Sequence, residues 1–280
     1  MQMGFSTMMR TRASRLAAHA ALSAAIAAPL AVSAPADAAA AQWAPYPVQV
    51  WETPFEMDSE RRSHDYTPLE STEGDWQLCV ALPHMKDSYW KAVNFGLVEA
   101  ARRLDVGMTI KTAGGYTELD KQKQALRECA RDGADAVIVG AIAKTGLNDV
   151  VESLVEKDIP VIDLVNGVSS DAIAAKSMVD FGEMGGKTGK YLAGEMAGED
   201  VRVAWFPGPE DAAWVSAGDA GFKDTVSGTS IEIVTTVHGD TTPETQKRLI
   251  ESTLAEHDGL DVIAGTAVTA STAADILAEK

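Results

Sequence analysis

The chain has 280 residues, with 24 Lys and Arg against 41 Asp and Glu, which gives a formal net charge of −17 at pH 7. A surface this acidic repels nucleic acid and anionic membranes, so neither is expected as a partner. The length allows one large domain or two smaller ones, each with a substantial core.

Residues 1–41 have the layout of a secretory signal peptide. Three arginines precede an apolar run at 16–32, and an alanine-rich stretch at 34–41 offers several small-x-small cleavage sites. The alternative is an uncleaved membrane anchor, which a run this short and rich in alanine disfavours. Removing the segment leaves 21 basic and 40 acidic residues, a formal charge of −19. The rest of the chain is expected in the periplasm, with no direct membrane insertion.

Residues 42–75 carry four prolines, two tryptophans and many charges, without sustained periodicity. They are predicted to form an extended N-terminal arm that lies on the body of the protein or reaches a partner.

A regular alternation begins at Trp76. Apolar strands are predicted at 76–82, 108–113, 136–140 and 160–165, separated by helical patterns at 89–104, 118–131 and 145–157. Strands that alternate with helices of this length form βαβ units and a parallel sheet. Residues 76–165 are therefore predicted to be a first α/β lobe.

The alternation breaks at 166–177, a turn-rich passage interpreted as a hinge, and a short strand is predicted to end at Val179–Asp180. A second series follows in residues 178–280. Its predicted helices are 184–196, 212–226, 243–257 and 271–278, and its predicted strands are 201–206, 231–237 and 261–265. This second lobe is expected to be incomplete at its C-terminal end, because no residues remain for a closing strand.

Cys79 lies in the first predicted strand and Cys129 late in the second predicted helix. An oxidising compartment permits a disulfide between them. The alternative is two buried thiols that never meet. No Cys/His cluster has the spacing of a metal site, so no metal is expected.

The stretch Lys86-Asp87-Ser88-Tyr89-Trp90 follows the first strand. Open α/β sheets bind ligands at the carboxyl ends of their strands, so a carboxylate beside a phenol and an indole suggests a pocket for a small cation or dipole. Tyr116 follows the second strand at the same edge. The alternatives are that Asp87 only caps a helix and that Tyr116 is an ordinary turn residue.

The stretch Gly182-Glu183-Met184-Gly185-Gly186-Lys187-Thr188 invites a nucleotide-binding interpretation, but the glycine spacing of a P-loop is wrong. A helix with small residues on a packed face is predicted instead. No nucleophile elbow or catalytic triad pattern occurs, so catalytic residues and a cofactor are not expected.

These residues resemble type I periplasmic binding proteins, a two-lobed fold in which each lobe is a parallel sheet flanked by helices. The resemblance rests on residues 82–90, on Ala113-Gly114-Gly115-Tyr116, on Leu164-Val165-Asn166 and on Pro207-Gly208-Pro209. Within that family it points to receptors that bind trimethylamine N-oxide (TMAO) and signal to a membrane-bound sensor histidine kinase, inducing TMAO respiration.

The resemblance implies that Asp87, Tyr89, Trp90 and Tyr116 contact the ligand from the first lobe. It places Phe181 where relatives carry a tryptophan that faces the ligand from the second lobe. Both cysteines also stand where relatives have cysteines.

The competing hypothesis is a substrate-binding protein for an ABC importer of a sugar or another small solute. Asp180 offers a carboxylate that suits sugar binding. Residues 265–268, in contrast, offer no charged side chain that could bind hydroxyl groups.

Overall fold

The computed structural model describes residues 44–53, 55–56 and 59–279. Apart from Ala44, all of these belong to one compact unit, Pro45–Lys280. The predicted signal peptide at 1–41 lies outside the described residues. Within the described ranges, each helix is too short or too polar to cross a bilayer.

The first sheet contains five parallel strands in the order β4-β3-β5-β6-β7. The strands are β3 (Gln77–Leu82), β4 (Gly107–Thr112), β5 (Ala136–Val139), β6 (Val161–Val165) and β7 (Ala175–Met178), and the helices between them are α1 (Ser88–Leu104), α2 (Leu119–Arg131) and α3 (Asn148–Val155). The expected α/β architecture of this lobe is confirmed.

Alternate side chains of β3 serve two separate cores, because successive residues of a strand point to opposite faces. Cys79 and Ala81 pack with α2 and α3. Val80 and Leu82 pack with Trp90 on the α1 face. The continuous apolar run of β3 is thus the pattern of a strand buried on both sides.

Strand β7 belongs to the first sheet, because Ile162 pairs with Ala175 and Val165 with Met178. The predicted boundaries, a hinge at 166–177 and a second lobe from 178, are therefore wrong at this point. The short strand predicted to end at Val179–Asp180 is present as Ala175–Met178, but its sequence Ala-Lys-Ser-Met does not show which sheet it joins. The connection between the sheets lies at residues 179–180.

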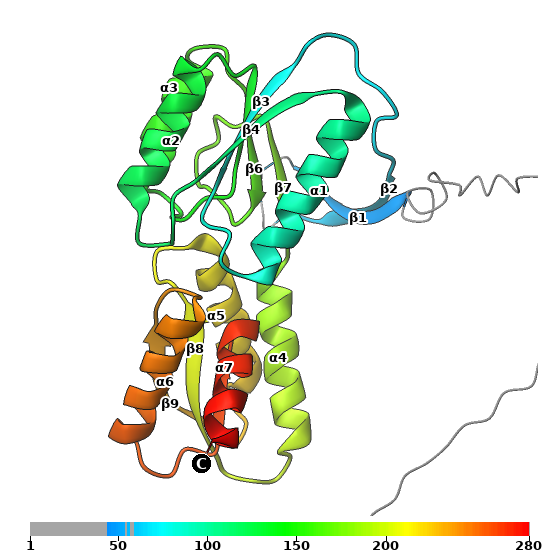
Figure 1. Ribbon diagram of the computed structural model, residues 1–280. Coiled ribbons are helices and arrows are strands. Elements are labelled where there is room, and N and C mark those ends of the chain that lie inside the picture. The colour runs from blue at the N-terminus through cyan, green and yellow to red at the C-terminus, as the bar shows by residue number, and fades with distance from the viewer. Residues whose placement is uncertain (1–43, 54, 57–58, 280) are drawn as a thin grey trace, which may run out of the picture. The chain divides into compact units, whose positions relative to one another are not determined.

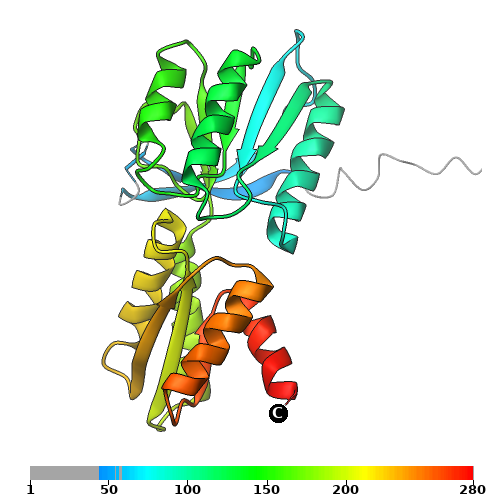
Figure 2. The ribbon, with the colours of Figure 1, turned by 60° about the vertical axis from the view of Figure 1, so that its left-hand side comes forward.

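The second sheet has three parallel strands in the order β10-β8-β9. Its strands are β8 (Val201–Gly208), β9 (Ile231–His238) and β10 (Val262–Gly265), and its helices are α4 (Phe181–Glu195), α5 (Ala213–Val226), α6 (Pro243–Glu256) and α7 (Ala267–Ala278). Helices α4 and α5 cover one face of β8, whereas α6 and α7 cover the other (Figure 2).

Two helices begin earlier than predicted because of their caps. Asp180 accepts a hydrogen bond from the backbone N of Glu183 (2.8 Å), so α4 starts at Phe181 and not at residue 184. Thr266 accepts from the backbone N of Thr269, so α7 starts at Ala267 and not at residue 271. Short polar side chains at this position satisfy a free N–H of the first turn.

The glycines of α4 let it approach α5 closely. A Cβ on Gly185 would lie 2.0 Å from the backbone O of Gly218, and a Cβ on Gly221 would lie 2.0 Å from the backbone O of Gly182. The glycine-rich stretch is therefore a helix-packing surface. This supports the predicted helix over the P-loop alternative.

Residues 42–75, expected as an extended arm, contain an antiparallel hairpin of β1 (Tyr46–Trp51) and β2 (Arg61–Tyr66) (Figure 1). The guanidinium of Arg61 lies over the ring of Trp51, 5.8 Å from its centroid, and forms an ion pair with Asp180. The hairpin is thereby attached to Asp180, the residue that caps α4.

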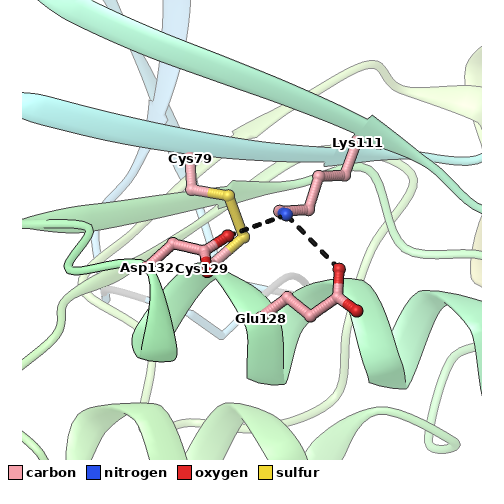
Figure 3. Close-up of a disulfide and its surroundings, with 5 residues drawn as sticks. All are labelled: Cys79, Lys111, Glu128, Cys129 and Asp132. Carbon is pink, nitrogen blue, oxygen red and sulfur yellow. Dashed lines mark hydrogen bonds and ion pairs between the residues drawn. A yellow bond between two sulfur atoms is a disulfide. The ribbon is translucent and has the colours of Figure 1, made fainter.

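A disulfide joins Cys79 of β3 to Cys129 of α2, with 5.6 Å between their Cα atoms (Figure 3). The structure therefore contains the paired alternative and not two separate thiols. Beside it, Lys111 of β4 pairs with Glu128 of the same helix (3.3 Å) and with Asp132 (3.0 Å), which caps the helix end. Both contacts attach α2 to the sheet.

We expect Gly185→Ala to lower the free energy of unfolding by about 1–3 kcal/mol, because the added methyl group collides with the α5 backbone. Gly194→Ala is the matched control in the same helix, since nothing lies within 4 Å of its Cβ position. That control should stabilise the protein by about 0.5–1 kcal/mol. Urea unfolding measures the free energy of unfolding of both variants. Equal changes in the two would contradict the packing role of Gly185.

Replacing both cysteines by alanine should lower the free energy of unfolding by about 4 kcal/mol, because the disulfide closes a loop with a sequence separation of 50. Chemical denaturation with and without dithiothreitol measures the effect. The reductant should destabilise the natural protein and leave the alanine variant unchanged. Insensitivity of the natural protein would show that the bond contributes nothing.

Candidate functional site

Loops that follow the carboxyl ends of several strands contact one another between the two sheets. Backbone N of Lys144, after β5, donates to the carbonyl of Asp211, after β8 (2.9 Å). Tyr116 and Ile142 pack with Ala212 and Val215. This is the edge at which ligands bind to open α/β sheets.

Helix α1 begins at the site with Asp87 as its cap. Oδ1 of Asp87 accepts from the backbone N of Trp90 (2.9 Å), so the predicted capping role is present. Trp90 is 2% exposed and points into the lobe. A Cβ on Gly140 would lie 2.6 Å from the tip of its indole, so the loop after β5 needs glycine there.

The hydroxyl oxygen of Tyr116 accepts two hydrogen bonds. One comes from Nε1 of Trp90 (3.3 Å) and the other from Nδ2 of Asn166 (3.1 Å). Burial raises the pKa of Tyr116 to about 12, although these two donors and the indole N–H of Trp214 oppose the shift. The phenol is therefore protonated at neutral pH, and its own O–H remains available to an acceptor.

Buried amides hold the surrounding loops. Nδ2 of Asn166 also donates to the carbonyl of Ala141 (2.7 Å), and Gln122 bonds both Gly140 and Ile142. Val165 has a φ of 72°, a left-handed conformation that a β-branched residue rarely adopts. Because Val165 directly precedes Asn166, this strained backbone lies at the site.

Two aromatic residues from the second lobe extend the cluster. The ring of Trp214, in the first turn of α5, lies 6.0 Å from that of Tyr116 and 5.4 Å from that of Phe181. Phe181 also packs against the core cluster that contains Trp90 and Leu82. Rings from both lobes thus contact each other.

Buried polar atoms without partners gather around Tyr116. Among the described residues, four buried side-chain atoms lack a hydrogen bond: His84 Nε2, Asp163 Oδ1, Trp214 Nε1 and Asp240 Oδ1. Three of these residues contact Tyr116, because His84 and Trp214 lie against its ring and Asp240 accepts from its backbone N (3.3 Å). Unpaired buried polar groups are rare in proteins, so their concentration marks a functional site.

Two carboxylates face His84, which is 1% exposed. Burial lowers the pKa of His84, while Asp87 and Asp240 act in the opposite direction and Lys86 reinforces the lowering. Its Nδ1 accepts from the backbone N of Lys86 (3.3 Å), so the neutral ring carries its proton on Nε2. Asp87 Oδ2 lies 3.9 Å from this atom, too far for a hydrogen bond.

The structure brings together Asp87, Trp90, Tyr116 and Phe181 of the predicted site residues. Tyr89 lies at the margin, 42% exposed, with its ring edge-on to Trp90 at 5.7 Å. Both oxygens of Asp180 have other partners, Oδ1 the cap and Oδ2 the guanidinium of Arg61.

Sequence reasoning missed Trp214, Asn166 and Asp240. The available signal was position, because each follows the carboxyl end of a strand. In the described part of the chain, no group of three His, Cys, Asp or Glu side chains is arranged to hold a metal ion.

Comparison with known proteins identifies relatives of this chain. Residues 78–280 match the family model for a periplasmic binding protein domain. The chain is 34% identical over 227 residues to the periplasmic protein TorT of Escherichia coli (strain K12), a match that covers 78% of this chain and 65% of TorT. The chain thus spans just under two thirds of that relative's length.

Two solved structures are also similar. One is an ABC transporter solute-binding protein from Bradyrhizobium sp. BTAi1 with bound bis-tris, at 47% identity and a TM-score of 0.67, covering 85% of this chain and 72% of that one. The other is the complex of the TorS sensor domain and TorT in the presence of TMAO, at 30% identity and a TM-score of 0.63, covering 73% of this chain and 70% of that one.

The family match spans most of the chain, and the two parallel sheets are those of the similar structures. The chain therefore belongs to the periplasmic binding protein family and is a relative of TorT.

Proposed function

We propose that this protein is a periplasmic receptor that binds TMAO between its two lobes and signals to a membrane-bound sensor histidine kinase. The identity to TorT and the similarity to the TorS–TorT complex support this proposal. The Tyr116 cluster is the proposed ligand site.

The chemistry of TMAO matches the cluster. TMAO is a neutral dipole with a methylated, cation-like nitrogen and a strongly accepting oxygen. Aromatic faces attract methylated nitrogen, each contact contributing about 0.5–2 kcal/mol depending on desolvation. Trp90, Tyr116 and Phe181 supply the rings, with Tyr89 at the margin. The carboxylate of Asp87 favours the positive end of the dipole.

The observation that carries the proposal is the hydrogen bonding of Tyr116. Its oxygen already accepts from Trp90 and Asn166, so its own proton is left for a further acceptor. An N-oxide oxygen accepts such a proton readily. The rings of the two lobes contact each other in this structure, so entry of a ligand requires Tyr116 and Trp214 to separate.

A solute-binding protein for an ABC importer is the second candidate. The 47% identical structure from an ABC transporter favours it, and bis-tris combines a tertiary amine with several hydroxyl groups. Neighbouring genes separate the two functions. Permease and ATPase genes favour import, whereas kinase, response-regulator and reductase genes favour sensing. Asp180, which suited a sugar, is occupied by the cap and by Arg61.

Calorimetry with TMAO, trimethylamine, glycine betaine and ribose tests the ligand. We expect TMAO to bind most tightly and Trp90→Phe to weaken it at least tenfold, about 1.4 kcal/mol, because the variant loses the N–H to Tyr116 and the larger ring face.

Trp76→Phe is the matched control for this variant. Trp76 is 48% exposed, and its Nε1 donates to the backbone of Glu73. The affinity of the Trp76→Phe variant for TMAO should match that of the natural protein. Ribose binding without any TMAO signal would reject the receptor, and unchanged affinity in Trp90→Phe would remove Trp90 from the site.

Ionisation of Tyr116 should occur only near pH 12. Titration of the absorbance at 295 nm, compared with Tyr116→Phe, measures it. Because the folded pKa exceeds the unfolded value of about 10, the folded state holds the proton more tightly, and this residue's contribution to stability falls as pH rises through that interval. A phenolate signal near pH 10 that is present in the natural protein and missing from Tyr116→Phe would contradict the buried, hydrogen-bonded phenol.

A further inference from the structure

Two of the unpaired atoms around Tyr116 come from the second lobe. Trp214 lies in the first turn of α5, after β8, and Asp240 lies in the loop between β9 and α6. Neither residue belongs to the first-lobe set on which the proposed function rests. Nε1 of Trp214 is a hydrogen-bond donor, and Oδ1 of Asp240 is an acceptor.

Trp205, a buried tryptophan of the same lobe, shows what a structural indole looks like here, whereas the ring of Trp214 is only partly buried. Nε1 of Trp205 donates to Asp219 Oδ1 (2.8 Å), and its ring stacks on Phe222 at 4.0 Å. Nε1 of Trp214 is also buried but makes no hydrogen bond of good geometry; the phenol of Tyr116 is near enough for this N–H to lower its pKa, and does not satisfy it. A buried donor without a partner costs free energy, which an acceptor on the ligand would recover.

Asp240 has one oxygen in use and one free. Oδ2 accepts from the backbone N of Tyr116 (3.3 Å), which fixes the carboxylate against the first lobe. Oδ1 is buried without a partner. The backbone carbonyl of Asp240 accepts from the buried side chain of Gln246 (2.9 Å), which holds the loop in place. The free oxygen is therefore held at the site by contacts on both sides.

We propose that Trp214 and Asp240 are the second lobe's polar contacts to the ligand. Trp214 Nε1 donates to the ligand's oxygen, and Asp240 Oδ1 faces its cation-like nitrogen. This inference rests on the proposed function for the identity of the ligand, but not for the existence of the two contacts. It makes the second lobe sensitive to both ends of the dipole.

Trp214→Phe tests the donor, because it keeps an aromatic ring and removes only the N–H and the second ring. Trp205→Phe is the matched control, with the same chemical change in the core of the same lobe. Calorimetry with TMAO and with bis-tris, and thermal unfolding, are measured on both variants and the natural protein. We expect Trp214→Phe to weaken TMAO binding at least tenfold and Trp205→Phe to leave the affinity within twofold of the natural protein's.

Asp240→Asn tests the acceptor, because the amide keeps an oxygen for Tyr116 and loses the charge. Asp219→Asn is its control. We expect a loss of at least fivefold in TMAO affinity for Asp240→Asn and none for the control. If the thermal unfolding midpoint of each site variant is no lower than that of its control, the loss of affinity comes from the ligand site and not from unfolding.

The outcomes separate this inference from the proposed function. TMAO affinity unchanged in Trp214→Phe and Asp240→Asn would overturn the inference and leave the receptor standing. If the natural protein binds bis-tris but not TMAO, the proposed function fails, and a tenfold loss of bis-tris affinity in Trp214→Phe would still support the inference. Binding of neither compound by the natural protein would overturn both.

Discussion

The hydroxyl of Tyr116 is the point on which the arrangement of the site depends. It accepts from Trp90, which follows β3, and from Asn166, which follows β6, while Tyr116 itself follows β4. One oxygen thus connects the ends of three strands of a parallel sheet. Burial strengthens these hydrogen bonds. It also raises the free-energy cost of any donor or acceptor that has no partner.

The lobes are stiff where the site needs support. Helix α2 is attached to the first sheet by the disulfide and by Lys111, and the same helix carries Gln122, which holds the loop after β5. In the second lobe, glycine contacts lock α4 against α5, the helix that carries Trp214. Stiff lobes joined at residues 179–180 can move as whole bodies, as the proposed function requires.

The sequence predicted the helices and strands well because apolar periodicity is strong in both lobes. It predicted the short strand β7 but not its partner, because four weakly apolar residues do not show that they pair with β6 at the edge of the first sheet. Within the site, Asp87, Trp90 and Tyr116 stood out because they follow strong strands directly. Trp214 did not, because five residues separate it from β8 and its neighbours resemble an ordinary apolar helix start.

Single polar residues such as Asn166 and Asp240 carry no spacing pattern at all. Their roles follow from contacts between segments that are far apart in the chain, such as Tyr116 and Asp240, whose positions differ by 124. Asp180 shows the opposite limit. Its position suited a ligand contact, but a helix start and an arginine from the hairpin already satisfy both of its oxygens.

Gly115 has a consequence for how near the two sheets can come. A Cβ there would lie 2.8 Å from Asp240 Oδ2, inside the distance that real Cβ atoms keep. The missing methyl group is the clearance that lets a carboxylate from one half reach the peptide N–H of the other. Alanine at this position would therefore force the Asp240 carboxylate to move away from that N–H.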